Sequence, residues 1–314
     1  MSGTASAKEA IGFIGIGLMG HGMAKNIVDK GWPLTFLGRS NRPPAEDLRQ
    51  RGATEVSTPK DVAARSTVIF LCVTGSPQVE EIVRGANGLI ESLQPGTVIV
   101  DCSTADPNST LALARLVAEK GGHFVDAPLS RTPKEAWEGT LDTMVGADPE
   151  IFARIQPVLA AWAGKIVHIG AVGDGHKMKL INNFISLGYG ALYAEAVTLA
   201  AKVGISHERF DSVIRGGRMD CGFYQTFMKW TLDHDRNAHK FTISNAHKDL
   251  RYLESMADAA GLVNPMGNAV KNTFAMAAAA GGDTHFVPQI VSHVTRQNGV
   301  DLGLPEPGPD QAAE

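Results

Sequence analysis

A lysine and three polar residues share one face of an expected helix. Lys179, Asn182, Asn183 and Ser186 are spaced i, i+3, i+4 and i+7, which brings their side chains to one side of a helix. Desolvation lowers the pKa of a lysine ammonium, so that it can transfer a proton near neutral pH. Lys179 is therefore a candidate donor of a proton to a carbonyl oxygen as hydride reaches the carbon, and it would stabilise the developing alkoxide. A lysine in solvent is the usual alternative, and it suits Lys177 on the opposite face.

A glycine-rich loop near the start of the sequence predicts a dinucleotide site. Its GxGxxG pattern follows an apolar strand and opens a helical pattern. That context suits a tight turn, a close approach of a pyrophosphate and close packing of the helix, with the anion on the helix N-terminus. A βα turn without a ligand is the alternative. The expected cofactor contacts are Gly15, Ile16, Gly17, Leu18, Met19 and Gly20.

The loop after the second expected strand favours NADP(H). A ribose 2′-hydroxyl is usually bound by a carboxylate about 20 residues after the glycines, whereas a 2′-phosphate is bound by arginine. Arg39, Ser40 and Arg42 lie in this loop, and no acidic residue comes before Glu46. Guanidinium groups and a hydroxyl suit a phosphate, so NADP(H) is favoured while NAD(H) stays open. A solvated loop is the alternative.

Polar residues follow two other expected strands of the same sheet. Val73 and Thr74 end one strand, and Thr104 follows another. Ligands of α/β sheets bind at the carboxyl ends of the strands, so these residues are candidate contacts of the nicotinamide half. Capping and turn roles remain the alternative.

A hydroxyl and a guanidinium lie together in a further loop. Ser130, Arg131 and Thr132 come after the expected strand 123–126. An arginine in such a loop can hold a carboxylate, a sulfonate or a phosphate through two parallel hydrogen bonds. A surface ion pair between Arg131 and Glu135 is the default interpretation when nothing else is known.

The composition is ordinary for a globular protein. The 314 residues include 44% hydrophobic and 20% charged residues, and this length favours two domains. A net charge of −4 leaves no basic excess for nucleic acid. The 3 cysteines are far apart and form no CxxC or Cys/His cluster, so we expect reduced thiols and no metal. We see neither a secretory signal nor an apolar run that approaches bilayer length, and we expect a cytoplasmic protein without a membrane partner.

Alternating strand and helix patterns predict a doubly wound, mainly parallel α/β Rossmann sheet. The expected strands are 11–15, 34–37, 68–73, 97–101, 123–126 and 166–169. The expected helices between them are 18–30, 109–120 and 149–162. Later helical patterns cover 178–203, 250–260 and 265–280. We expect a cofactor domain over 1–174, an all-α domain over 175–303 and a disordered, proline-rich tail over 304–314.

Four motifs together resemble the β-hydroxyacid dehydrogenase family, which includes 3-hydroxyisobutyrate dehydrogenases and semialdehyde reductases. They are FIGIGLMG at 13–20, DAPLS at 126–130, GxxGxGxxxKxxNN at 170–183 and KDL at 248–250. The resemblance implies a Rossmann domain joined by a long helix to a helical domain. It also implies a homodimer or homotetramer, which the long apolar helix makes plausible.

The resemblance implies roles for single residues. Lys179 matches the proton donor or acceptor, and Asn183 matches a partner of the substrate or of the lysine. Thr104 would touch the nicotinamide or the substrate, and Ser130 the acid group of the substrate.

Three residues of the helical part complete the implied site. Lys248 resembles a contact on the cofactor side. Phe241 and Asp249 match a pair that glyoxylate reductases place at the active site, although helix packing is an equal alternative for Phe241.

The substrate loop departs from the family pattern. Arg131 and Thr132 stand where the family usually has two glycines. A similar loop occurs in sulfolactaldehyde reductases, where the sulfonate is held by positions that correspond to Arg131, Asn182 and Ser186. Three sulfonate oxygens suit a guanidinium, an amide and a hydroxyl. A carboxylate suits them nearly as well, and those reductases generally use NAD(H).

The sequence thus predicts NADPH-linked reduction of a small anionic aldehyde, or oxidation of a 3-hydroxy acid. A sulfolactaldehyde-type substrate is one hypothesis, and 3-hydroxyisobutyrate, glyoxylate or succinic semialdehyde chemistry is the alternative. Imine reductases share the fold but generally lack a lysine at position 179. A non-catalytic NADP-binding module would be free to lose Lys179, Asn183 and Ser130.

Overall fold

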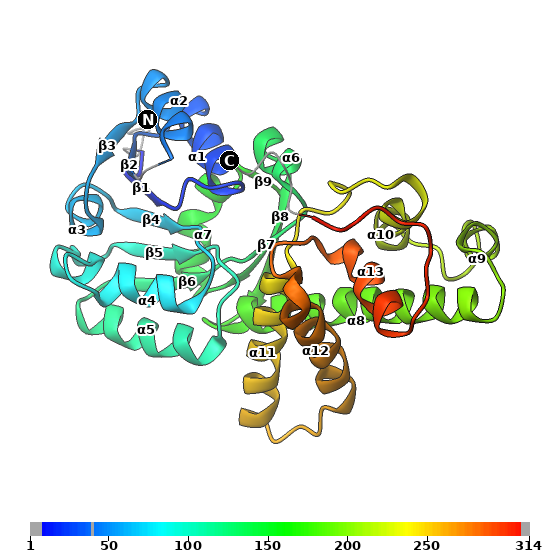
Figure 1. Cartoon of the computed structure of the whole chain (residues 1–314). Coiled ribbons are helices and arrows are strands. Elements are labelled where there is room, and N and C mark those ends of the chain that lie inside the picture. The colour runs from blue at the N-terminus through cyan, green and yellow to red at the C-terminus, as the bar shows by residue number, and fades with distance from the viewer. Residues whose placement is uncertain (1–7, 39–40, 309–314) are drawn as a thin grey trace. The chain divides into compact units, whose positions relative to one another are not determined.

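The computed structural model describes residues 8–38 and 41–308 (Figure 1). The chain divides into two compact units, the first ending at Lys179 and the second beginning at Leu180. The division therefore falls inside a helix, five residues beyond the expected boundary of 174. Arg39 and Ser40, both expected to contact the cofactor, lie outside the described residues.

Parallel strands organise the first unit. The strands of the described chain are β1 Ile11–Ile14, β2 Leu34–Leu37, β3 Thr54–Val56, β4 Val68–Leu71, β5 Val98–Asp101, β6 His123–Asp126, β7 Leu129–Ser130, β8 Leu141–Gly146 and β9 Ala163–Gly170. They form one sheet in the order β3-β2-β1-β4-β5-β6-β8-β7, and β9 pairs with β8. Strands β1 to β6 are parallel, whereas β8 runs antiparallel to β6 and β7. The predicted mainly parallel sheet is confirmed.

Both faces of this sheet are covered. Phe13, Phe36 and Phe70 belong to a core on one face, while Ile14 and Leu71 belong to a second core on the other. Strands that are buried on both faces have continuous apolar sequences, which is why β1, β4 and β5 could be predicted. The strands β3, β7 and β8 were not predicted, since β3 and β7 are very short and β8 alternates.

Helices connect the strands of the first unit. They are α1 Gly20–Asp29, α2 Arg42–Gln50, α3 Pro59–Ala63, α4 Ser76–Arg84, α5 Pro107–Glu119, α6 Pro133–Glu138, α7 Pro149–Leu159 and the 3₁₀ turn η1 Leu89–Glu91. Four of them, α2, α3, α4 and α6, were not predicted. All four are shorter than ten residues, so their apolar spacing covers few turns and gives only a weak helical pattern.

The second unit is helical, as predicted. Its elements are α8 Asp174–Lys202, which begins in the first unit, α9 His207–Ile214, α10 Gly222–Asp233, α11 Ile243–Ala259, α12 Pro265–Ala277, η2 Ala278–Gly282, η3 Val287–Gln289 and α13 Ile290–Gln297. The helices α11 and α12 lie side by side (Figure 1). Trp230, Phe227 and Phe274 are fully buried in its core, and the indole of Trp230 donates a hydrogen bond of 3.0 Å to Ser292.

The helix α8 corrects one expectation. Its length and an 18-residue window of mean hydropathy 1.3 meet the criterion for a membrane-spanning helix, so an apolar run of that length does exist. The core helix of a globular unit meets the same criterion, and 44% of this window is buried inside the protein. Ile185, Leu192 and Leu199 remain exposed at seven-residue intervals along α8.

The start of the expected tail also differs from the prediction. Residues 304–308 have no regular secondary structure, but Leu304 packs against the core of the second unit. The Glu306 carboxylate lies 2.7 Å from the guanidinium of Arg296. The packing of Leu304 thus anchors the start of a segment that its prolines suggested would be disordered, while the exposed ion pair adds little. Residues 309–314 lie outside the described residues.

Two helical glycines predict opposite effects on stability. A Cβ atom at Gly22 would lie 2.6 Å from the backbone carbonyl carbon of Ala136, whereas one at Gly188 would meet only Val270, at 3.8 Å. We expect Gly22→Ala to lower the free energy of unfolding by about 1–3 kcal/mol through overpacking. We expect Gly188→Ala to raise it by about 0.5–1 kcal/mol, because alanine restricts the unfolded chain more. Urea unfolding of both variants measures these shifts, and shifts of the same sign would contradict the packing described here.

Candidate active site

The three glycines after β1 have different surroundings. Gly15 adopts a φ of +101°, and a Cβ atom there would lie 2.2 Å from the carbonyl oxygen of Cys72. A Cβ atom at Gly20 would lie 1.9 Å from the carbonyl oxygen of Gly15, whereas one at Gly17 would meet nothing within 4 Å. The fold thus requires glycine at positions 15 and 20, but leaves open space at 17, where a pyrophosphate would approach. The loop fits a dinucleotide.

The residues between these glycines differ in exposure. Ile16 is buried in the sheet core and Met19 packs partly against it, whereas Leu18 is exposed. A contact of Ile16 with a cofactor would therefore involve its backbone rather than its side chain.

A carboxylate that the sequence did not reveal lies beside the loop after β2. The Arg42 guanidinium donates two hydrogen bonds to Glu55 on β3, of 2.7 and 3.0 Å, and this pair keeps the pKa of Glu55 below its usual value. Glu55 was missed because it is distant in sequence and enters the site only through the pairing of β2 with β3. This edge therefore offers both a guanidinium and a carboxylate to an adenosine ribose.

The loops after β4 and β5 are joined to each other. The backbone N–H of Val73 donates to the hydroxyl of Ser103 at 3.1 Å, and the N–H of Ser103 donates to Asp101 at 2.9 Å. The hydroxyl of Ser103 therefore links two loops. Thr104 is half-buried and Thr74 is exposed at the same edge, where both can reach a ligand.

Arg131 is held in an unusual conformation. Its φ of +86° is a left-handed value that costs a residue other than glycine about 1–2 kcal/mol. Its Nε lies 2.9 Å from a carboxylate oxygen of Asp142, and the side chain is 50% exposed. Asp142 is directly opposite Ser130 in the pairing of β7 with β8. The default interpretation, a pair with Glu135, is replaced by this ion pair.

Thr132 begins the helix α6. Its hydroxyl accepts a hydrogen bond from the N–H of Lys134, and the Glu135 carboxylate accepts one from the N–H of Thr132, which completes a capping box. The hydroxyl of Thr132 also donates to Glu135 at 2.5 Å. This hydroxyl is thus occupied in stabilising the helix start, while Ser130, half-buried at the end of β7, precedes the turn.

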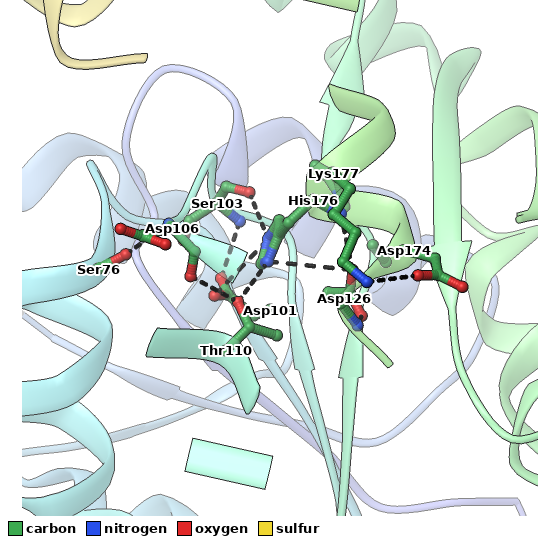
Figure 2. A network of polar contacts seen from close by, with 12 residues as sticks. Ser76, Asp101, Ser103, Asp106, Thr110, Asp126, Asp174, His176 and Lys177 are labelled. Carbon is green, nitrogen blue, oxygen red and sulfur yellow. Dashed lines mark hydrogen bonds and ion pairs between the residues drawn. The ribbon is translucent and has the colours of Figure 1, made fainter. Parts of the chain in front are cut away.

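A buried polar network surrounds the start of α8 (Figure 2). Asp126, at the end of β6, has no exposed surface. One of its carboxylate oxygens accepts a hydrogen bond of 2.6 Å from the N–H of Gly173, and the other accepts one of 2.7 Å from the N–H of His176. Burial raises the pKa of Asp126, while the neighbouring imidazole and these two N–H groups oppose the rise.

The His176 side chain extends this network. Its Nε2 donates to the carbonyl oxygen of Ser103 at 3.1 Å, and its Nδ1 lies 2.8 Å from the hydroxyl of Thr110 on α5. The ring lies 3.9 Å from Asp101 and 4.0 Å from Asp126. Figure 2 shows the ring directed toward the loop after β5.

Lys179 lies three residues, nearly one turn, further along α8 and is half-buried. Lys177, in contrast, forms an ion pair of 2.9 Å with Asp174 in the first turn (Figure 2). Both lysines are half-buried, so their exposure alone does not distinguish them, and the predicted role of Lys179 stays a prediction. The helix then continues into the second unit with Asn182 exposed and Asn183 buried.

Residues distant in sequence meet in the second unit. The side-chain amide of Asn183 donates a hydrogen bond of 2.7 Å to Asp249, and the Lys248 ammonium lies 3.2 Å from the other oxygen of this carboxylate. Both Asn183 and Asp249 are buried. Asp249 thus orients the amide that follows Lys179 on the same helix face.

Two other predicted residues take local roles. The hydroxyl of Ser186 donates to the backbone carbonyl of Asn183 at 3.1 Å. Phe241 packs partly against the helical core, as its structural alternative anticipated. Within the described ranges, no group of three or more histidine, cysteine and acidic side chains could hold a metal ion.

Known proteins share both units. Residues 10–170 match the family described as the NAD binding domain of 6-phosphogluconate dehydrogenase, and residues 173–293 match the NAD-binding domain of NADP-dependent 3-hydroxyisobutyrate dehydrogenase. The 2-hydroxy-3-oxopropionate reductase of Escherichia coli is 34% identical over 274 residues, which are 87% of this chain and 92% of that protein. The chain belongs to the β-hydroxyacid dehydrogenase family. It is an NAD(P)-dependent oxidoreductase that acts on CH–OH groups.

Other members of this family are similarly close. The 3-sulfolactaldehyde reductase of Escherichia coli is 30% identical over 272 residues, which are 87% of this chain and 91% of that protein. The solved structure of Mycobacterium tuberculosis 3-hydroxyisobutyrate dehydrogenase with L-serine superposes with a TM-score of 0.81 at 26% identity, over 91% of this chain and 99% of that chain.

Different substitutions in the glycine loop of this β-hydroxyacid dehydrogenase should separate binding from folding. Gly20→Ala should lower the free energy of unfolding by about 1–3 kcal/mol, because its Cβ would meet backbone. Gly17→Ala should change it by no more than about 0.5 kcal/mol, but should weaken dinucleotide binding about tenfold, since the methyl group fills the space for the pyrophosphate. Fluorescence titration with NADPH and urea unfolding measure both. Unchanged dinucleotide affinity in Gly17→Ala would argue against a ligand at this loop.

Proposed function

We propose that this family member reduces a small aldehyde bearing an anionic group, with NADPH as reductant and Lys179 as proton donor. The reverse reaction oxidises a 3-hydroxy acid, with Lys179 accepting the proton. The observation that carries the proposal is the half-buried position of Lys179, on a helix face that continues with Asn182 and the oriented amide of Asn183. A nicotinamide bound at the glycine loop would supply hydride chemistry at the carbonyl carbon. The Lys179 ammonium protonates the oxygen as negative charge develops there.

The anionic group of the substrate would be held by Arg131. Asp142 fixes the guanidinium through Nε, and the half-exposed remainder of the fork can donate two hydrogen bonds to a carboxylate or a sulfonate. The left-handed backbone at this residue supports a functional role, because such strain concentrates at binding sites. The names of two relatives, an oxopropionate reductase and a sulfolactaldehyde reductase, agree with an acid-bearing aldehyde. Comparing kcat/KM for an aldehyde that carries a carboxylate with that for an aldehyde that carries a sulfonate decides which anionic group the enzyme prefers.

NADP(H) remains the proposed cofactor. Arg42 supports it, and the family matched by the second unit is described as NADP-dependent. Glu55 acts in the other direction, since its carboxylate pairs with Arg42 and would repel a 2′-phosphate. The ratio of kcat/KM for NADPH and NADH tests this part of the proposal.

Self-association is a further part of the proposal. The exposed residues Ile185, Leu192 and Leu199 form an apolar stripe along α8, and contiguous exposed apolar surface marks interaction sites. A homodimer or homotetramer would cover it. The molar mass in solution, from light scattering, tests this.

Lys179→Ala should lower kcat by about 10²- to 10⁴-fold, because general acid catalysis is lost. The dissociation constant for NADPH should stay within about threefold of the parent value, because the dinucleotide loop is unchanged. The assay follows loss of NADPH absorbance with a panel of semialdehydes. Lys177→Ala is the matched control and should retain activity, because Lys177 is half-buried like Lys179 but forms an ion pair with Asp174 in the first turn of α8. Equal turnover in the two variants would refute the role of Lys179.

Arg131→Gly should raise KM for acid-bearing aldehydes by about 10- to 100-fold, the worth of charged hydrogen bonds. Glycine accepts the left-handed backbone without strain, so folding should be unaffected. KM for an uncharged aldehyde of similar size, such as propanal, should not rise. Arg131→Lys tests whether charge without the planar fork is sufficient. If KM rose equally for charged and uncharged aldehydes, Arg131 would not be the anion contact.

A further inference from the structure

Asp126 caps a helix from a distant strand. A helix N-terminus leaves N–H groups without partners in the helix, and carboxylates are favoured there by the helix dipole. In α8 the partner is not the residue that precedes the helix but Asp126, at the end of β6, whose two oxygens accept from Gly173 and His176. The start of α8 is therefore fixed relative to the sheet.

Glycines make this close approach possible. A Cβ atom at Gly175 would lie 2.8 Å from one Asp126 oxygen, and a Cβ atom at Gly146 would lie 2.6 Å from the other. Larger residues at either position would displace the carboxylate from the helix start. Of the glycines that precede Lys179, Gly175 is therefore the one that leaves room for this carboxylate, and its missing Cβ also avoids the carbonyl oxygen of Met144 at 2.4 Å.

His176 connects the same helix turn to the cofactor edge. Its ring is bonded to Ser103 and Thr110, and Ser103 in turn accepts from the N–H of Val73. His176 thus connects Asp126, through its backbone N–H, with the loop after β5, through its ring (Figure 2), and Ser103 connects that loop with the loop after β4.

We propose that Asp126 and His176 are positioning residues for Lys179. They fix the rotation of the first turn of α8 about the helix axis and its position along that axis. The reference is the pair of loops after β4 and β5, which are expected to contact the nicotinamide half. Lys179 follows His176 by three residues. The inference rests on the proposed role of Lys179 and assigns to Asp126 and His176 the contacts that align this lysine. An error of about 1 Å at a reacting group can cost about 10²-fold in rate, so this alignment should be visible in kcat.

Asp126→Asn tests the proposal. An asparagine keeps one acceptor oxygen but turns an NH₂ group toward one of the two backbone N–H groups, so the helix start must shift. We expect kcat to fall by about 10- to 100-fold. The dissociation constant for NADPH, measured by fluorescence, should change by less than about threefold, because the glycine loop is untouched.

A double-mutant cycle separates positioning from general damage. If Asp126 acts through Lys179, Asp126→Asn should lower kcat in the parent protein but by less than about threefold in the Lys179→Ala background, because coupled residues are not additive. A merely structural role would lower kcat by the same factor in both backgrounds, and that result would overturn the inference. A Lys179→Ala variant with full turnover would instead overturn the proposed function, and the positioning role with it.

Two further variants complete the design. Asp148→Asn makes the same change at the N-cap of α7, where the exposed carboxylate accepts from the N–H of Glu150 at 3.0 Å, and kcat should stay at the parent value. Thr110→Val removes the hydroxyl beside His176 Nδ1, together with its hydrogen bond of 3.2 Å to the carbonyl oxygen of Asp106 within the first turn of α5. It should lower kcat by about three- to tenfold, again only when Lys179 is present, and it replaces Asp126→Asn in the cycle if that variant does not fold. An unchanged kcat in Thr110→Val would remove His176 from the positioning role.

Discussion

The burial of a carboxylate beneath the first turn of α8 is the constraint on which much of this protein depends. Asp126 has no exposed surface, and a buried charge is tolerated only when hydrogen bonds replace its water. The backbone N–H groups of Gly173 and His176 provide them. One carboxylate therefore completes β6, begins the longest helix and excludes side chains at two nearby glycines. The end of β6 and the start of α8 are thereby held together.

The candidate functional residues are distributed over several separate elements. The glycine loop after β1 provides a turn and open space, the loops after β4 and β5 are bonded to each other, and α8 carries the lysine. In the second unit, Asp249 holds the amide of Asn183 while pairing with Lys248. Such supporting contacts decide whether a reactive group stays where it is useful. Asp126, Asp142 and Asp249 thus each hold another group of the candidate site in place.

Sequence reasoning was effective where one physical rule dominates. Fully covered strands such as β4 are apolar throughout, and the GxGxxG loop has few explanations once a strand precedes it. Sequence reasoning failed where the ion-pair partner of a site residue lies on a neighbouring strand that is distant in sequence. Glu55 reaches Arg42 only through the neighbouring positions of β2 and β3, and Asp142 reaches Arg131 only through the pairing of β7 with the unpredicted β8. The Asp126 and His176 side chains were within recognised motifs, but their joint role needs three dimensions to be seen.

If Arg131 holds the anionic group as proposed, its backbone conformation restricts how substrate preference can diverge. A left-handed main chain admits glycine freely and asparagine or aspartate with little strain, but resists branched side chains. Few amino acids can therefore replace Arg131 without loss of stability. Selectivity for the acid group would change in large steps, by gain or loss of the whole guanidinium, rather than by gradual trimming. A library built to broaden the range of accepted aldehydes should vary the neighbouring Asp142 instead, where the strand conformation tolerates many residues.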